Sequence, residues 1–556
     1  MQDTFVSSLG QYLNRVSRRD LLRGSALLGL APGLEAASTA AVSSPAAAKG
    51  VAVTSATAAN IYESIGVHPV INCRGTYTII GGSLELPEVT HAQHAAAQHY
   101  VQLDELADGV GQRLAEITGA EWGMISSGCA AGLAHSTAAC IAGGNPDLHT
   151  RIPNLAGFAK DEVVIPKHSR NEYDAAIRSI GVRIVEVGNE QEFKAALGPR
   201  VGMIYVLAGP HAETGPLTYD MIYPAARERN IPVLVDAAAE MLTIPNVHLQ
   251  RGATLVGYSG GKCIRGPQCA GLILGRKDLV KAAWVHSAPH HGYGRAMKVG
   301  KEEAMGMLAA VEAWTKRDHH AEWNTWMSWM NHIAKETGSV QGVTTSIRET
   351  KELSNHSPVL QIRWDTDRIG ITGADVEHTL FTTEPRIALS GRGRGRFGHP
   401  SPDHESGVSI TAYMMCPGDD KIVAERLRTI LSKAAGTKLA EDTAPPSSDV
   451  SGAWDVQIEF AAGRSTHNLY LQQNGSDITG THQGDYLARD LLGSLHGNQI
   501  KMTSSIGEQH GAVLNYTFSG TVTPEGMGGD LDMSEYRGAK WTAIRHKSDF
   551  GGPGRA

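Results

Sequence analysis

The run Ile231-Pro232-Val233-Leu234-Val235-Asp236-Ala237-Ala238-Ala239 is the most informative stretch of the sequence, because an apolar segment ends there in a carboxylate. Similar short apolar runs occur at 163–165, 183–187, 201–207 and 255–258. Segments with helical spacing separate them, at 173–180, 190–197 and 219–229. This alternation predicts an α/β fold over residues 60–337, a mostly parallel sheet covered by helices on both faces.

Two further regions follow this large domain. Residues 304–335 have the composition of one long helix, which leads to a smaller α+β lobe at 338–436 with a strand expected at 386–390. A linker is expected over 437–450. From 451 to 548, short alternating runs separated by Gly, Asn and Ser predict an all-β barrel or sandwich of about six to eight strands. These runs are 454–460, 468–473, 477–482, 499–504, 514–519 and 529–533.

The first 48 residues have the pattern of an export signal. Arg18 and Arg19 precede a mildly apolar stretch at 24–34 and an Ala/Ser-rich run to residue 48. This order is typical of a twin-arginine signal peptide, which moves folded proteins to the periplasm or outside the cell. The alternative is a flexible extension with a chance Arg pair. No mature apolar run reaches 18 residues, so we expect no membrane anchoring after export.

Composition narrows the classes of function. Hydrophobic residues make up 41% and charged residues 19%, which excludes a disordered chain. The net charge is −7, and Lys and Arg are not concentrated in one region, which argues against a nucleic-acid partner. Six cysteines without close pairing exclude a disulfide framework or a zinc-finger array. A large enzyme or a binding protein remains.

The decapeptide Tyr258-Ser259-Gly260-Gly261-Lys262-Cys263-Ile264-Arg265-Gly266-Pro267 places a lysine among glycines directly after an apolar run. Flanking glycines let a backbone approach a bound group closely. A lysine amine in this position can form a Schiff base with pyridoxal 5'-phosphate; the alternative is an ordinary loop lysine. Lys262 is therefore the candidate catalytic residue, and it joins Ser259 among the candidate cofactor-binding residues.

Asp236 ends a strand that we expect in the middle of the sheet. Ligands of open α/β sheets bind at the carboxyl ends of the strands. A carboxylate there can keep the nitrogen of a pyridine ring protonated, and the small Ala238 can lie under such a ring. The alternative is that Asp236 caps the segment that follows.

A Gly/Ser turn opens a predicted helix upstream of these residues. The free backbone N–H groups at a helix start attract a phosphate group. The candidates for this role are Ser127, Gly128, Cys129 and Ala130. His168, after the run at 163–165, is a candidate to stack on the cofactor ring, and a hydrogen-bonded structural histidine is the alternative.

The order of four motifs resembles that of fold-type I pyridoxal phosphate enzymes. The motifs are INCRGTYTIIGGS at 71–83, the turn at 126–132, VDAAAE at 235–240 and SGGKCIRGPQ at 259–268. The chain is most similar to the selenocysteine synthase-like branch, which includes the D-glucosaminate-6-phosphate ammonia-lyase group, over about residues 60–436. The resemblance implies a pyridoxal phosphate cofactor and a homodimer or larger homo-oligomer. The acidic composition and the export signal argue against the tRNA-dependent activity of selenocysteine synthase itself.

The resemblance also points to the substrate side of the site. The smaller lobe of such enzymes commonly presents an arginine to the substrate carboxylate, and Arg386 has that position here. A guanidinium group binds a carboxylate through two parallel hydrogen bonds. Arg392 follows in a Gly-Arg run at 391–396, for which a solvated loop or a nucleic-acid contact are the alternatives. Arg74, in the first motif, is a third candidate.

Two other groups of residues are interpreted as structural. His286, His290 and His291 lack a carboxylate or cysteine at metal-ligand spacing, so we predict no metal site and favour a pocket loop or a subunit contact. Four cysteines near the expected site are interpreted as small packing residues. They are Cys73, Cys129, Cys263 and Cys269.

Aromatic residues recur along the C-terminal module, which resembles small lipocalin-like modules in pattern. We interpret them as core and cross-strand residues, with a ligand-binding barrel mouth or an oligomer contact as the alternatives. They are Trp454, Tyr470, Tyr486, Tyr516, Tyr536 and Trp541.

Together these features predict an exported pyridoxal phosphate lyase acting on a small molecule. The expected reaction is α,β-elimination from an amino acid with a β-hydroxyl group, which releases ammonia and a 2-oxo acid. This choice rests on the resemblance alone, because the same residues support transamination, racemisation and aldol cleavage. A non-catalytic secreted binding protein is the second alternative.

Overall fold

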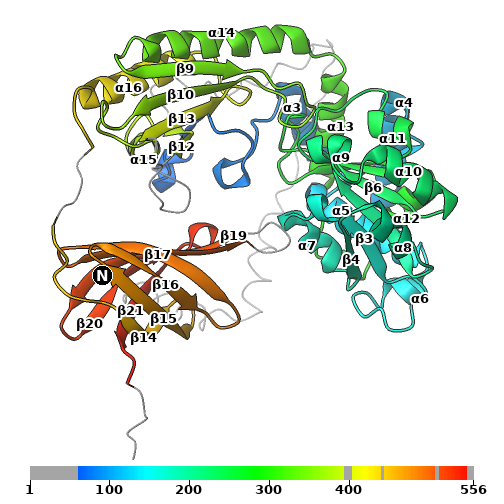
Figure 1. Cartoon of the computed structure of the whole chain (residues 1–556). Helices are drawn as coiled ribbons and strands as arrows, with labels where there is room; N and C mark the ends of the chain where they lie inside the picture. Colours follow the sequence, from blue (N-terminus) through cyan, green and yellow to red (C-terminus); the bar gives the residue numbers. More distant parts are fainter. Residues whose placement is uncertain (1–59, 393–403, 440–443, 508–512, 548–556) are drawn as a thin grey trace, which may run out of the picture. The chain divides into compact units, whose positions relative to one another are not determined.

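The computed structural model describes residues 60–392, 404–439, 444–507 and 513–547 (Figure 1). Its largest sheet has seven strands in the order β2-β8-β7-β6-β5-β3-β4. The strands are β2 Trp122–Ser126, β3 Glu162–Pro166, β4 Arg183–Val187, β5 Val201–Leu207, β6 Val233–Asp236, β7 Leu255–Ser259 and β8 Gly271–Gly275. All five predicted runs form strands, which confirms the mostly parallel sheet. The sequence analysis misses β2 and β8, whose short runs contain glycine, a weak strand former.

Strand direction determines where functional groups gather. β8 runs antiparallel to β2 and β7, and the other pairs are parallel. The carboxyl ends of β2 to β7 therefore meet at one edge. Both faces of the sheet are buried: in β5, Met203 and Tyr205 face one hydrophobic cluster, and Ile204 and Val206 face the other.

Helices cover both faces of this sheet, as predicted. α5 and α12 contribute to the cluster on one face, and α4, α10 and α13 to the cluster on the other. The helices are α3 Pro87–Ala96, α4 Leu103–Thr118, α5 Gly128–Ala142, α6 Pro146–His149, α7 Ala175–Arg178, α8 Glu190–Ala196, α9 Pro210–Thr214, α10 Tyr219–Glu228, α11 Val247–Arg251, α12 Lys277–Val285 and α13 Lys301–Trp314.

Residues 304–335 form two helices, so the prediction of one long helix is wrong. α13 ends at Trp314, and α14 spans His319–Gly338. Asp318 accepts a hydrogen bond from the backbone N–H of Ala321 and thereby caps the start of α14. Composition conceals the break, because Trp, Met and Ala are frequent on both sides of it.

The smaller lobe contains a four-stranded sheet in the order β12-β13-β10-β9. α14 and α15 contact this sheet, and α16 packs on α14 (Figure 1). The elements are β9 Val343–Arg348, β10 Val359–Asp365, α15 Gly373–Thr382, β12 Ser390–Arg392, β13 Glu405–Thr411 and α16 Asp419–Ala434. The predicted strand at 386–390 is split between β12 and a two-residue strand, β11 (Ile387–Ala388). β11 pairs with β1 (Ile71–Asn72) and so ties the first motif to this lobe.

The C-terminal module is a closed barrel of eight antiparallel strands, which confirms an all-β domain and selects the barrel over the sandwich. Its strands are β14 Gly452–Glu459, β15 Arg464–Asn474, β16 Asp477–Gln483, β17 Ala488–His496, β18 Gln499–Gly507, β19 Val513–Thr523, β20 Gly526–Asp532 and β21 Gly538–Arg545. The sequence analysis misses β17 and β21. The hydrophobic core of the barrel is formed by residues between Val450 and Ala543.

The aromatic residues of the barrel divide into two groups. Trp454, Tyr516 and Trp541 are buried in the interior, as predicted. Tyr470, Tyr486 and Tyr536 are exposed, so the core interpretation is wrong for these three. Tyr470 takes the outward position between inward Leu469 and Leu471, and the other two lie outside the strands.

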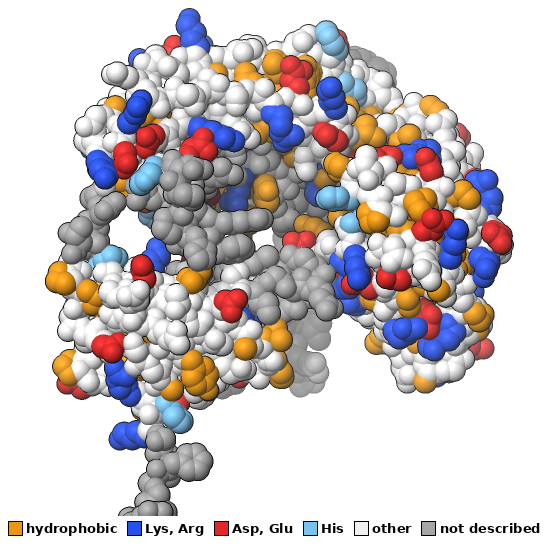
Figure 2. Space-filling model, in the orientation of Figure 1, with side chains coloured by type: hydrophobic (Ala, Val, Ile, Leu, Met, Phe, Trp, Pro, Cys, Tyr) orange, Lys and Arg blue, Asp and Glu red, His pale blue; other side chains and the backbone are white. Residues whose placement is uncertain are grey.

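Within the described ranges, no helix is long and apolar enough to span a bilayer. Figure 2 shows Lys and Arg side chains interspersed with Asp and Glu over the face in view. The predicted export signal at 1–48 and most of the Gly-Arg run, from residue 393 on, lie outside the described residues.

Candidate active site

Several predicted residues lie at the sheet edge where the parallel strands end. Asp236 is the last residue of β6, and Ser259 is the last residue of β7. His168 lies in a short 3-10 helix, η3 (Lys167–Ser169), directly after β3, and α5 begins two residues after β2. Parallel pairing therefore brings to one edge residues that are more than 100 positions apart in the sequence.

Asp236 is buried and hydrogen-bonded on both carboxylate oxygens. Tyr205 Oη donates to Oδ2 at 2.9 Å, and the backbone N–H of Ala238 donates to Oδ1 at 3.1 Å. The thiol of Cys129 lies 3.9 Å from Oδ1. Burial raises the pKa of Asp236, while the hydrogen bonds and the charge of Lys262 oppose that rise. The carboxylate therefore also caps the next turn, as the alternative interpretation proposed.

Tyr205 and Asn171 support Asp236, and the sequence analysis misses both. Asn171 Nδ2 donates to Tyr205 Oη at 2.9 Å, so Tyr205 receives one hydrogen bond and passes another to Asp236. Burial, followed by the nearby negative charge of Asp236, raises the pKa of Tyr205, so its hydroxyl stays protonated as a donor. A hydroxyl within the otherwise apolar run 201–207 was the available signal.

Lys262 lies in the turn after β7, with its side chain half-buried. Its Nζ is 6.0 Å from the centre of the Tyr173 ring, and its charge acts on both Asp236 and Cys129. Among the residues that the structure describes, the ammonium group makes no hydrogen bond and no ion pair. An amine without a competing partner is suited to react with a carbonyl group.

The glycines beside Lys262 are also required by the folding of the loop itself. A Cβ on Gly260 would lie 2.6 Å from the carbonyl oxygen of Pro267, and one on Gly261 would lie 2.8 Å from Cα of Gln268. These positions are therefore glycine because the loop folds back closely on itself. Gly82, from the first motif, also approaches this loop, since its Cβ would lie 2.9 Å from the carbonyl oxygen of Gly261.

The start of α5 provides uncapped backbone donors. Ser127 is the N-cap residue but makes no side-chain capping hydrogen bond, and Gly128 has a φ of +81°, which favours glycine. Ser127, Gly128 and Ala130 are half-buried, whereas Cys129 is buried against the sheet. The 15-residue helix therefore presents its first N–H groups and the positive end of its dipole at this edge.

One ring nitrogen of His168, Nε2, makes no hydrogen bond to a described residue. This nitrogen is buried, and the ring centre of His168 lies 6.3 Å from that of His211. Burial lowers the pKa of His168, so the imidazole is neutral. The structural alternative implies a hydrogen bond at this nitrogen, and no described residue provides one, so the stacking role stays a prediction.

The three candidate arginines differ in their surroundings. Arg386 donates to the backbone carbonyls of Phe381, at 2.7 Å, and His68, at 3.2 Å, so its guanidinium joins two segments of backbone. Arg74 lies 3.8 Å from Glu377, and its buried Nε has no partner within the described chain. Arg392 is the last residue of β12, and its side chain lies outside the described part.

The histidine cluster separates in the structure. His286 Nδ1 lies 2.6 Å from Nδ1 of His149, and its Nε2 bonds to the carbonyl of Gly143. Burial lowers the pKa of His286 to about 4. His290 instead lies 3.2 Å from Asp104. No group of metal-ligating side chains occurs within the described residues.

The cysteines near the site are protonated thiols. Burial raises the pKa of Cys73 and Cys129, and raises that of Cys263 to about 12; partial desolvation and the nearby Glu303 raise the pKa of Cys269. Cys263 donates to the carbonyl of Glu240 at 3.0 Å. The packing interpretation is wrong for Cys269, which is exposed, and incomplete for Cys129, which faces Asp236.

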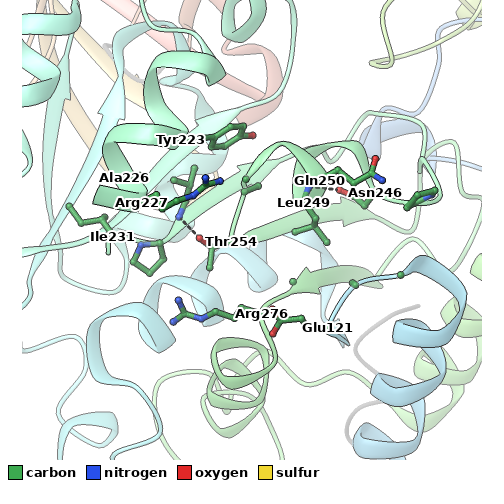
Figure 3. A pocket seen from close by; sticks show the side chains of 18 of the residues that line it. Glu121, Tyr223, Ala226, Arg227, Ile231, Asn246, Leu249, Gln250, Thr254 and Arg276 are labelled. Carbon is green, nitrogen blue, oxygen red and sulfur yellow. Dashed lines mark hydrogen bonds between the residues drawn. The ribbon is translucent and has the colours of Figure 1, made fainter. Parts of the chain in front are cut away.

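A cavity of about 480 Å³ lies at the opposite edge of the sheet (Figure 3). Its lining includes Val233, the first residue of β6, and Thr254, directly before β7. Arg227 and Arg276 contribute charged groups to it (Figure 3). None of the predicted site residues lines this cavity, so it is separate from the catalytic cluster.

The residues at the carboxyl edge fit the predicted cofactor. Lys262 provides an amine that makes no hydrogen bond or ion pair with a described residue and can react with the aldehyde, and Asp236 provides a carboxylate for the ring nitrogen. The uncapped start of α5 suits the phosphate group, and His168 has a free nitrogen beside the same edge. All four features arise from one strand edge, as a single bound molecule requires.

Comparisons with known proteins agree with this geometry. D-glucosaminate-6-phosphate ammonia lyase of Salmonella typhimurium is 30% identical over 386 residues, which cover 68% of this chain and 99% of that protein. The 5'-C-glycyluridine monooxygenase-decarboxylase of a Streptomyces species is 35% identical over 46% of this chain and 65% of that protein. The L-seryl-tRNA(Sec) selenium transferase of Proteus mirabilis is 27% identical over 44% and 56%, respectively.

A solved structure supports the same relationship. The structure of D-glucosaminate-6-phosphate ammonia-lyase superposes with a TM-score of 0.59 and 29% identity, covering 67% of this chain and 99% of that one. No protein-family model matches the sequence.

Proposed function

Because the chain belongs to the D-glucosaminate-6-phosphate ammonia-lyase group of fold-type I enzymes, we propose that it is a pyridoxal-phosphate-dependent lyase. The proposed reaction is the release of ammonia from an amino acid that carries a β-hydroxyl group, with a 2-oxo acid as the other product. The observation that carries this proposal is the unpartnered Lys262 amine beside buried Asp236, at the edge where α5 begins.

Each residue of the cluster has a proposed role. Lys262 holds the cofactor and, once released from it by the substrate amine, removes the proton from Cα through its Nζ. Asp236, fixed by Tyr205, keeps a proton on the ring nitrogen. When bound, pyridoxal phosphate supplies an acceptor for the electron pair left at Cα. The first turn of α5, with Ser127 to Ala130, holds its phosphate group, and Ser259, Ala238 and His168 border its ring.

The atoms of the reaction balance without an external oxidant. The substrate loses the Cα proton and the β-hydroxyl group, which leave together as water. Hydrolysis of the C–N bond then returns one water molecule and releases ammonia. The net change is therefore an amino acid converted to a 2-oxo acid and ammonia.

For the substrate carboxylate, the structure favours Arg74 over Arg386. Arg74 has an unpartnered buried Nε and lies in the motif whose Gly82 approaches the Lys262 loop. Tyr413 Oη hydrogen-bonds to Thr76 at 3.0 Å and so fixes the same motif. Arg386 is proposed as a structural clamp, because its donors already bind two backbone carbonyls.

The proposal is tested by the absorbance spectrum of the purified protein. We expect a visible band that borohydride removes, and its loss in Lys262→Ala. Lys167→Ala is the matched control, because Lys167 is exposed at the same sheet edge and the band should persist. Release of ammonia together with a 2-oxo acid from β-hydroxy amino acids tests the reaction. A colourless protein after incubation with pyridoxal phosphate contradicts the cofactor assignment.

We also propose a homo-oligomer and export. Large apolar side chains are exposed within residues 66–101, as expected of a surface covered by a second copy. They are Val67, Tyr77, Ile79, Leu84, Tyr100 and Val101. A monomer in light scattering contradicts the proposed homo-oligomer.

Export is tested separately. A chain that leaves the cytoplasm equally well after replacement of Arg18 and Arg19 by Lys contradicts the proposed twin-arginine signal.

A further inference from the structure

One end of the barrel interior is polar, although the rest of the interior is apolar. Five inward-facing polar side chains lie on five consecutive strands, near the barrel end at which the loops 460–463 and 484–487 lie. They are His467 on β15, His482 on β16, Arg489 on β17, Ser504 on β18 and Tyr516 on β19, all between 0% and 9% exposed.

The two histidines form a hydrogen-bonded chain with Ser504. Ser504 Oγ lies 2.7 Å from His482 Nδ1, and His482 Nε2 lies 2.8 Å from His467 Nδ1. Burial lowers the pKa of both histidines, that of His482 to about 3, and the charge of Arg489 adds to this effect. Both imidazoles are therefore neutral near pH 7, and Arg489 is the one formal charge among the buried barrel residues that the structure describes.

Arg489 has no anionic partner among the residues that the structure describes. Its side chain makes no ion pair with any described residue, and its buried Nε makes no hydrogen bond within that set. Its remaining contacts are a long 3.4 Å hydrogen bond from Nη1 to the carbonyl of Leu487 and a position 5.0 Å from the Tyr516 ring centre. The nearby Asp485 accepts a hydrogen bond from Ser465 and lies 3.6 Å from His467 rather than pairing with Arg489. A buried cation without a counter-charge is costly to a fold.

We propose that this end of the barrel binds a ligand carboxylate, with Arg489 as its principal partner. A single negative charge balances the single guanidinium, and the buried Nε–H, which has no partner among the described residues, can donate together with a neighbouring N–H to one carboxylate through two parallel hydrogen bonds. Below the cluster, fully buried Leu469, Met502 and Phe518 fill the interior of the barrel. We therefore expect only the carboxylate group of the ligand to reach Arg489, while the rest of the ligand stays at the barrel mouth. Tyr486, 95% exposed in the adjoining loop, offers an aromatic surface for that body.

The test measures carboxylate binding to the full-length protein by equilibrium dialysis, with labelled acetate and labelled dodecanoate as probes. Wild-type protein should contain a saturable site that Arg489→Gln weakens by about 10- to 100-fold, the range expected for hydrogen bonds to a charged group. Arg464→Gln is the matched control, because Arg464 is exposed at the same barrel end and pairs with Glu459. Hydrogen exchange should show ligand protection in peptides covering 464–507, which separates this site from the catalytic lobe.

The two probes distinguish the sources of the carboxylate. Binding of acetate identifies a small organic acid as sufficient, whereas binding of dodecanoate alone identifies an amphiphilic acid whose chain lies on the barrel mouth. Equal binding by Arg489→Gln overturns the proposal, and so does a site that takes inorganic phosphate but neither carboxylate.

Stability provides a second, independent measurement. If Arg489 is kept for a ligand, Arg489→Met removes a buried unpaired charge and leaves the unfolding temperature of the ligand-free barrel unchanged or higher. Ligand should raise that temperature in wild-type protein and have no effect in the variant. A barrel that unfolds several degrees earlier in Arg489→Met assigns the residue a structural role instead and overturns the proposal.

Discussion

At the scale of single residues, the environment of Asp236 controls the chemistry of the site. Burial raises its pKa, and two hydrogen bonds with the charge of Lys262 oppose that effect. Among the groups that oppose this rise in pKa, the hydrogen bond from Tyr205 has the largest effect, and Asn171 in turn holds Tyr205 in place. The carboxylate therefore depends on a residue that lies 31 positions away in the sequence and on a neighbouring strand.

Replacing Tyr205 with Phe should weaken catalysis without unfolding the large domain. The change removes the 2.9 Å hydrogen bond to Oδ2, so the pKa of Asp236 rises further and its ionised form is less favoured. We expect kcat to fall by roughly tenfold, the effect of one hydrogen bond to a charged group, with the acidic limb of the pH–rate profile shifted upward. Tyr219→Phe is the control, because that buried hydroxyl has no described partner. Unchanged kinetics in Tyr205→Phe would remove Tyr205 from the mechanism.

Arg74 and Arg386 should respond differently to the same substitution. Arg74→Gln is expected to raise KM by about 10- to 100-fold with a smaller change in kcat, because it removes the charged hydrogen-bond donor that we propose for the substrate carboxylate. Arg386→Gln should lower thermal stability and leave KM nearly unchanged, because its guanidinium binds the carbonyls of Phe381 and His68. Steady-state kinetics and thermal melts of both variants measure these effects. A raised KM in Arg386→Gln together with an unchanged KM in Arg74→Gln would instead support Arg386 as the residue that binds the substrate carboxylate.

At the scale of elements, the break between α13 and α14 is stabilised by charges. Glu322, in the first turn of α14, accepts two 2.8 Å hydrogen bonds from Arg317, and His319 lies 3.5 Å away. Burial alone would raise the pKa of Glu322, but the hydrogen bonds from His319 and Arg317 and their charges lower it to about 2. The break is thus a specific structure rather than a frayed helix.

This lowered pKa makes stability depend on pH in a defined direction. The folded state binds the Glu322 proton more weakly than the unfolded state does, so the stabilisation is complete above the ordinary pKa of 4.5 and is lost as pH falls toward 2. Allowing for partial exposure, Glu322→Gln should cost about 1–2 kcal/mol at pH 6 and progressively less at lower pH. Urea unfolding at pH 6, 4 and 3 measures the change.

Glu336→Gln is the control for that experiment. Glu336 lies on the same helix and faces Arg428 at 3.8 Å on the surface, so its replacement should have little effect at any of these pH values. A loss in Glu322→Gln that stays constant from pH 6 to pH 3 would show that packing, and not ionisation, is responsible.

At the scale of the whole molecule, the barrel is a separately packed module of the chain. The related ammonia lyase is matched over 99% of its length by 68% of this chain, and the barrel has its own hydrophobic core. The residues proposed to bind cofactor and substrate all precede residue 393. Catalysis should therefore not require the barrel.

A shortened chain that ends at residue 439 tests this independence. We expect it to fold, to retain the visible absorbance band and to keep kcat/KM within about twofold, because the barrel has its own hydrophobic core and the residues proposed to bind cofactor and substrate all lie outside it. The carboxylate site proposed for the barrel should be lost at the same time. A shortened chain that cannot bind pyridoxal phosphate would show that the barrel is part of the catalytic unit.

The sequence alone determined the strand runs of the large domain, the all-β C-terminal module and the positions of Lys262 and Asp236. These features are local, since apolar periodicity and glycine-flanked motifs are contained within a few consecutive residues. Prediction from the sequence missed β2, β8, β17 and β21, whose strand patterns are weak. It also missed the break after α13, because the residues on both sides of the break have a similar composition.

Only the tertiary structure showed which side chains meet. Tyr205 and Asn171 support Asp236, and Arg386 donates to backbone carbonyls. Within the described residues, the Arg74 Nε has no hydrogen-bond partner and buried Arg489 has no counter-charge. Sequence cannot reveal these facts, because hydrogen bonding and burial depend on chain segments that folding brings together from distant positions. The residue types were visible in the sequence, but their electrostatic environment was decided by the fold.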